Sequence, residues 1–194
     1  SFDLLLTLVV PIIVICTVLA PEIIYILAGS GYEGAILPMR LIMPLLLIVG
    51  IAQILALQVL VPLRMDNQIL RTSIIGAAVG LASNFIFVSR FGSVGTSVVL
   101  LISETVITLV YIMFITKSKL IHFPNKMIFK HIIGAIPFLI INLLISQFHS
   151  GDFTMAIIAI IVNGVTFICI QSLFLKNVFL GNLVQTLLNR LKQI

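Results

Sequence analysis

The sequence has very little charge, and this scarcity determines the class of protein. Asp, Glu, Lys and Arg make up 9% of its 194 residues, whereas hydrophobic residues make up 61%. A soluble domain carries about 25% charged residues, so the composition indicates an integral membrane protein. The apolar runs also lack the period-two polarity of membrane β-barrel strands. We therefore expect an all-α membrane protein.

Motifs for catalysis and metal binding are also scarce. There is no DxD, P-loop or HExxH motif, so we predict no enzyme activity, no cofactor and no metal ion. The two cysteines lie in apolar runs, where we interpret them as small buried hydrophobes. No basic run carries interleaved aromatics, which argues against a nucleic-acid partner despite a net charge of +5. The three histidines, His122, His131 and His149, are expected near the membrane edges, on both sides.

Apolar segments long enough to span a membrane are the main positive feature. A spanning helix needs about 20 mostly apolar residues. We predict six spans, with the third and fifth short: 3–20, 40–62, 72–89, 94–115, 131–148 and 153–175. The whole of 1–175 is then a six-helix transmembrane bundle. Because the chain enters an apolar run directly at Ser1, we expect it to be a piece of a longer protein.

Lys and Arg are distributed unevenly over the predicted connections. Two, Arg40 and Arg90, fall on one side, and the other nine fall on the opposite side: Arg64, Arg71, Lys117, Lys119, Lys126, Lys130, Lys176, Arg190 and Lys192. The positive-inside rule makes the richer side cytoplasmic, including both chain ends. Residues 176–194 place their apolar side chains on one helical stripe. They predict an amphipathic helix on the cytoplasmic membrane face, with a partner-binding helix as the alternative.

The segment "VLAPEIIYILAGSGYEGA", residues 18–35, interrupts the first apolar run. Pro21 suits the first turn of a new short helix, and Glu22 would lie at the positive end of that helix. Gly29 suits its end. We predict a turn and a short helix at the outer interface. The alternative is one continuous helix with Glu22 inside the membrane.

Polar residues inside the predicted spans are the candidates for function. Glu104 lies near the middle of the fourth span, either as a cavity-lining or proton-coupled carboxylate or as a structural partner of a neighbouring helix. Asn84 follows Gly76 and Gly80, whose spacing allows close helix packing. Asn84 then either bonds across helices or lines a substrate path.

Two further pairs of carboxamides lie in predicted spans. Gln53 and Gln58 are five residues apart, which places them on different faces of an α-helix. Gln58 is the one nearer the cytoplasmic end. Asn142 and Asn163 lie in the last two spans and are expected to pair with each other as a structural contact.

These features resemble the C-terminal part of polysaccharide and O-antigen flippases of the multidrug/oligosaccharidyl-lipid/polysaccharide exporter superfamily. The resemblance rests on "LAPEIIYILAGSGYEGAILPMRLIMP", on the Gln58, Pro62, Arg64 element at a helix end, and on Asn84 followed by "RFGSVGTS" and Glu104. It covers residues 4–120. Beyond that range only the two-helix pattern agrees.

The resemblance implies a transporter of the bacterial inner membrane, with an N-terminal lobe missing from this chain. Such a protein moves undecaprenyl-pyrophosphate-linked oligosaccharide to the outer leaflet by alternating access, with H⁺ or Na⁺ as a possible coupling ion. It implies a cationic cavity, for which Arg64 is the inner and Arg40 the outer candidate, although each cation can instead anchor to lipid headgroups. Glu104, Asn84 and Gln58 complete the candidate set.

Two other functions remain open from the sequence. A drug/cation antiporter of the same superfamily shares the architecture, and a protonatable Glu104 suits it. A membrane-embedded polysaccharide polymerase or glycosyltransferase is disfavoured, because every predicted outward connection is about a dozen residues or fewer and such enzymes are expected to carry a large outward loop.

Overall fold

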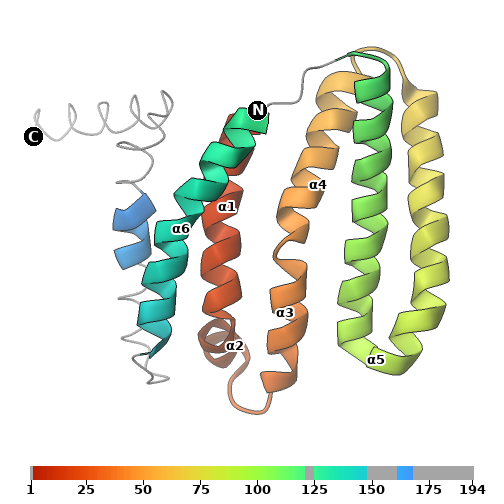
Figure 1. The fold of residues 1–194 in the computed structure, drawn as a ribbon. Coiled ribbons are helices and arrows are strands. Elements are labelled where there is room, and N and C mark those ends of the chain that lie inside the picture. Colours follow the sequence, from red (N-terminus) through yellow and green to blue (C-terminus); the bar gives the residue numbers. More distant parts are fainter. Residues whose placement is uncertain (1, 121–124, 148–160, 168–194) are drawn as a thin grey trace, which may run out of the picture.

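The computed structural model describes residues 2–120, 125–147 and 161–167, and these ranges are helical with no strand. This confirms the all-α expectation. The helices stand side by side with their axes roughly aligned (Figure 1). The amphipathic helix predicted at 176–194 lies outside the described residues, as does most of the span predicted at 153–175.

The chain begins with two helices joined at a sharp corner. Helix α1 runs over Phe2–Val18 and α2 over Ala20–Ala28, bent by 76° from each other. Pro21 lies in the first turn of α2, where its missing N–H costs no helical hydrogen bond, and Gly29 ends the helix with a φ of +83°. The predicted turn and short helix are confirmed, and the continuous-helix alternative is wrong.

The second apolar segment is divided into several pieces. A 3₁₀ turn, η1 (Glu33–Ala35), leads into α3 (Ile36–Ile42) and α4 (Leu45–Gln53), and a π-helix, η2 (Ile54–Leu60), completes it. The helix begins before residue 40, earlier than predicted, because Pro38 is tolerated in a first turn. Pro44 separates α3 from α4, since it has no N–H to bond the preceding turn.

Helix α5 (Asp66–Lys117) is a hairpin of two antiparallel arms, drawn yellow and green in Figure 1. Its reversal occurs at Gly92, whose φ of 53° and ψ of −124° are non-helical and readily adopted only by glycine. The arms pack closely, as the Gly76 and Gly80 spacing predicted. A Cβ on Gly76 would overlap the Ile107 side chain, and one on Gly80 would lie 3.4 Å from Ser103.

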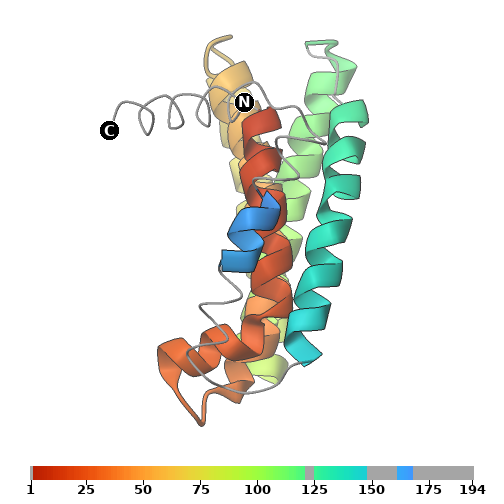
Figure 2. The ribbon, with the colours of Figure 1, turned by 90° about the vertical axis from the view of Figure 1, so that its left-hand side faces the viewer.

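Helix α6 (Asn125–Gln147) packs along α1, and Figures 1 and 2 both show the two helices side by side. The Asn142 Nδ2 donates to Asn163 Oδ1 at 2.8 Å, and Asn163 Nδ2 donates back to Asn142 Oδ1 at 3.0 Å. Both residues are buried, at 0% and 4% exposure. The predicted pairing of these two side chains is confirmed.

Two described segments are long and apolar enough to cross a membrane, namely Glu33–Leu60 and Asp66–Lys117. The bent pair α1 and α2 makes a third candidate if it is one span. The predicted number of six spans stays a prediction. The turn after η2, both ends of α5 and the start of α6 gather at one end of the molecule, with the reversal of α5 and the loop after α2 at the other (Figure 1).

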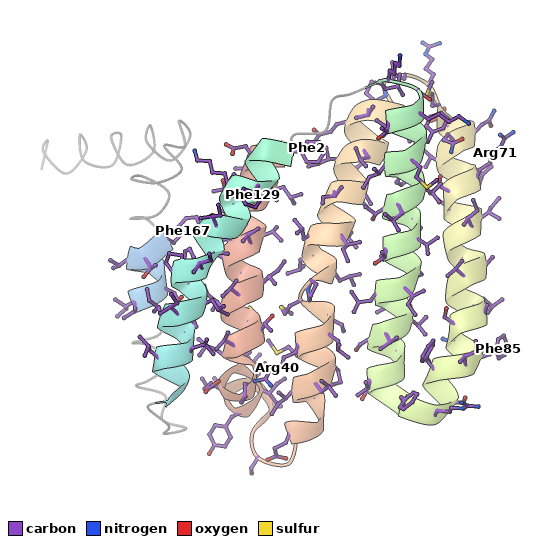
Figure 3. All side chains as sticks on the ribbon, viewed as in Figure 1. Phe2, Arg40, Arg71, Phe85, Phe129 and Phe167 are labelled. Carbon is purple, nitrogen blue, oxygen red and sulfur yellow. The ribbon has the colours of Figure 1, made fainter. Side chains whose placement is uncertain are left out.

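A buried apolar cluster joins η2 to the second arm of α5, near the end where Arg71 lies (Figure 3). It contains Ala52, Leu55, Val59, Leu60, Tyr111 and Ile115. Its two α5 residues, Tyr111 and Ile115, are four positions apart and therefore lie on one helix face. The cluster therefore sets which face of the second arm is turned toward α4.

Candidate functional site

The two candidate arginines lie at opposite ends of the molecule. Arg64 is exposed in the turn after η2, with a left-handed φ of 55°. Arg40 is on α3 near the α1–α2 corner, at the end away from Arg71 (Figure 3). A single ligand headgroup cannot contact both, so the structure does not bring these two cations into one site.

Arg40 has a specific partner in the corner between α1 and α2. Its Nε donates to the backbone oxygen of Thr17 at 3.0 Å. That carbonyl belongs to the last turn of α1, where oxygens have no partner within the helix and where positive charge is favoured. The contact assigns Arg40 a structural task as a cap of α1, which the sequence alone did not suggest.

The same corner contains oxygen atoms without partners. Among the described residues, Glu22 Oε2 and Thr17 Oγ1 are buried and have no hydrogen-bond partner. Glu22 lies in the first turn of α2, where the positive end of the helix dipole favours a carboxylate.

The loop that follows, Gly29 to Gly34, has the spacing GxGxxG. It follows a helix, whereas the dinucleotide-binding fingerprint requires a preceding strand.

Glu104 lies half-buried on the second arm of α5. One turn further along, the Thr108 hydroxyl lies 2.8 Å from the Glu104 backbone oxygen and 3.2 Å from the Ile48 oxygen of α4. Residues four apart share a helix face, so Glu104 lies on the side of α5 that packs against α3 and α4. Further along the same arm, Tyr111 bonds the Ser73 side chain of the other arm.

Gln58 lies in the π-helix, and this changes its relation to Gln53. In η2 the N–H groups bond five residues back, as between Val61 and the Ala56 oxygen at 2.9 Å. Residues five apart therefore lie closer to one face than they do in an α-helix. The prediction of separate faces assumed α-helical geometry throughout, whereas the π-helix turns these two positions closer together. Both glutamines are exposed, and π-helical turns occur frequently at functional sites.

Asn84 is exposed on the first arm of α5, one turn beyond Gly80. The described residues contain no hydrogen bond from its side chain across to another helix. The arms approach closely at Gly76 and Gly80. The hypothesis that Asn84 bonds across helices is therefore not supported in this part of the chain, and lining a substrate path stays a prediction.

One polar cluster was missed by the sequence analysis. His131 Nε2 lies 3.2 Å from Thr7 Oγ1 and 3.4 Å from Asp3 Oδ1, between α6 and α1. His131 is buried at 4% exposure, and its place near a membrane edge stays a prediction. The four-residue spacing of Asp3 and Thr7, which puts them on one helix face, was the available signal.

Within the described residues, the candidate side chains therefore lie in separate places and do not form one site. Gln58 and Arg64 lie on one exposed helix end, Glu104 is in the α4–α5 interface, and Arg40 caps α1. Within these ranges no group of three or more His, Cys, Asp or Glu could hold a metal ion.

Comparisons of the chain with protein-family models, curated proteins and solved structures give no match.

Proposed function

We propose that this chain is part of a membrane transporter that moves a lipid-linked oligosaccharide from the cytoplasmic to the outer leaflet. The observation that carries the proposal is that each segment resembling the flippase family coincides with a break in a helix. The Ala-Pro-Glu element begins α2, the Gln58 to Arg64 element spans the π-helix and its turn, and the Phe-Gly element reverses α5 at Gly92.

Six spans with both ends in the cytoplasm are part of the same proposal. The described end that holds Arg64, Arg71 and Lys117 is then the cytoplasmic face of a bacterial inner membrane, because positive residues stay inside. The N-terminal lobe of the family's architecture would complete the path beside this bundle. H⁺ or Na⁺ is the proposed coupling ion.

Arg64 and Gln58 would act first on the substrate. A guanidinium binds phosphate through forked hydrogen bonds, so the exposed Arg64 suits the pyrophosphate of an undecaprenyl carrier. The exposed carboxamides of Gln53 and Gln58 have two donors and an acceptor each, which suits sugar hydroxyls. Gln53 ends α4 and Gln58 lies on η2, shortly before the Arg64 turn, so these groups follow one another toward one helix end.

A drug/cation antiporter is the second candidate, and the half-buried Glu104 favours it. An ionisable group at membrane depth usually faces a cavity or a proton path. Glu104 lies on a buried helix face beside the Thr108 hydroxyl, so a change of charge there would act on the packing of α5 against α4. In the flippase proposal Glu104 serves coupling rather than substrate binding.

The test is export of surface polysaccharide by full-length protein carrying Arg64→Ala, Gln58→Leu or Glu104→Gln. Arg71→Ala is the matched control, because Arg71 is an exposed cation at the same end. We expect the Arg64 variant to lower export about tenfold, equivalent to about 1.4 kcal/mol, and the control to export normally. Wild-type export by the Arg64 and Gln58 variants would remove these substrate assignments. Proton-driven drug efflux that is lost in Glu104→Gln, without any export phenotype, would establish the antiporter instead.

A further inference from the structure

Helix α2 turns away from the bundle at a fixed angle. It is bent by 76° from α1, so that Figure 1 looks almost along its axis and Figure 2 shows it projecting sideways from the end of α1. Leu19 and Ala20 at the corner are buried. Two backbone hydrogen bonds of 2.9 Å cross the corner, from Leu19 N to Ile15 O and from Ile23 N to Leu19 O. Packing and these bonds therefore set the direction of α2.

The far end of α2 is an exposed apolar surface. Tyr25, Ile26 and Leu27 are exposed there, and Leu27, at 79%, is the most exposed large hydrophobic residue of the part of the chain that the structure describes. The loop after the helix adds the exposed Tyr32. The sequence between Glu22 and Glu33 carries no charge. A surface of this kind marks a site of contact with another molecule or with a membrane.

We propose that α2 and the loop after it, residues 20–34, are a membrane anchor that lies in the interfacial layer of the bilayer. The lipid interface is the partner of the exposed apolar surface, with Leu27 among the outer carbons of the acyl chains. The proposal rests on the bundle spanning a membrane but not on any transported substrate. It can therefore fail while the proposed transport function stands.

The length of α1 places α2 at this depth. A spanning helix has about 17–25 residues, and α1 has 17, from Phe2 to Val18. Val18 therefore falls near the boundary of the hydrocarbon core when α1 crosses the membrane. A helix that turns by 76° at this point runs along the boundary and does not continue through the core.

The side chains around α2 suit the two sides of this boundary. Tyrosine is enriched at membrane interfaces, because its ring is apolar and its hydroxyl is hydrated, and Tyr25 and Tyr32 supply two such residues. Glu33 is exposed, and its Oε1 accepts from the Gly31 N–H at 3.1 Å. Arg40 is exposed as well. Because ionised groups are costly in hydrocarbon, these two charges limit how deep the segment lies, while its apolar side chains hold it in the lipid.

The test uses the absence of tryptophan from the chain, which makes any introduced indole the only one. Leu27→Trp is placed in the full chain, in phosphatidylcholine vesicles whose lipids are brominated near either the carbonyl or the methyl end of the acyl chains. The high exposure of Leu27 leaves room for the larger ring. We expect the quenching of fluorescence to place this indole about 5–10 Å into the headgroup and acyl boundary, the depth of interfacial helices.

Leu8→Trp is the matched control, because Leu8 is exposed on α1 and lies ten residues before Val18, about 15 Å along the helix. Bromines near the methyl end should quench this indole most strongly. Tyr32→Trp is a second, conservative probe of the same segment, which keeps the test decisive where Leu27→Trp folds poorly. Its indole should be quenched both by bromines near the carbonyl end and by aqueous iodide.

Three results would overturn the proposal. Quenching of the Leu27→Trp indole by iodide alone would place α2 in water. Protection from both iodide and brominated lipid would show that another protein segment covers it. A profile equal to that of Leu8→Trp would place α2 within the hydrocarbon core.

Discussion

The two sides of the bundle place their carboxamide side chains in opposite ways. In the α1 and α6 region, Asn142 pairs with Asn163 and His131 contacts Thr7 and Asp3, with the asparagines and the histidine buried. In the α4, η2 and α5 region, Gln53, Gln58 and Asn84 are exposed, and none of them bonds across to a neighbouring described helix. The buried asparagines of the first region stabilise a helix contact, whereas the exposed carboxamides of the second are available to another molecule.

The two regions differ because burying a polar group without a hydrogen-bond partner costs free energy. A buried donor or acceptor without a partner costs about 1–3 kcal/mol, so polar residues inside a helix interface must pair within it. Exposed carboxamides do not carry this cost where water, a sugar or a second lobe can hydrogen-bond to them. This difference predicts where a substitution affects stability and where it affects activity.

The largest expected stability effect comes from breaking the buried pair. Asn142→Leu leaves Asn163 without one of its partners, and we expect the free energy of unfolding to fall by about 2 kcal/mol. Asn84→Leu is the matched control in the exposed region, with an expected change within about 0.5 kcal/mol. Unfolding in a denaturing detergent measures both values. Equal losses would remove the distinction between the two regions.

The double variant Asn142→Leu/Asn163→Leu sharpens the same comparison. Since each single variant leaves the other carboxamide of the pair without its partner and the double variant does not, the double variant should lose less stability than the sum of the two single variants. The coupling energy from this double-mutant cycle should be of the order of 0.6 to 1.7 kcal/mol, the range known for bonds between membrane helices. Strict additivity would show that the two side chains do not interact.

The next effect concerns the close packing of the two α5 arms at their glycines. Gly76→Ala places a methyl group against Ile107, and we expect a loss of about 1 kcal/mol because the side chain must move aside. Gly80→Ala has room beside Ser103 and should be close to neutral. Thermal unfolding compares the two, and equal destabilisation would contradict the observed asymmetry of the arms.

The smallest effect is expected at the α1–α2 corner. Arg40→Ala removes the donor to the Thr17 oxygen, with an expected loss of about 0.5 kcal/mol. Arg90→Ala, the other cation predicted at this end, should be silent. Hydrogen exchange of the last turn of α1 is the more sensitive measurement, since the loss of a cap increases fraying there. Unchanged exchange in Arg40→Ala would show that the contact has no capping role.

Local signals predicted part of this architecture well. Pro21 and Gly29 predicted the bounds of α2, and Gly76 and Gly80 predicted the close face of α5, because each acts through its own backbone or missing side chain. The π-helix was not predictable, because one shifted hydrogen-bond register leaves no composition signal. It also altered the relation of Gln58 to Gln53, which decides whether the two can contact one ligand.

The sequence by itself determined the class of the protein, its helices and the pairing of Asn142 with Asn163. The chain has little charge and long apolar runs, and in lipid the backbone N–H and C=O groups of such runs are bonded within a helix. Two buried carboxamides in neighbouring helices can then bond each other. Only the tertiary structure decided that Arg40 caps α1 and that His131 is enclosed beside Asp3 and Thr7. Those contacts join residues 23 and 124 or more positions apart, and the packing of whole helices, not any local pattern, brings them together.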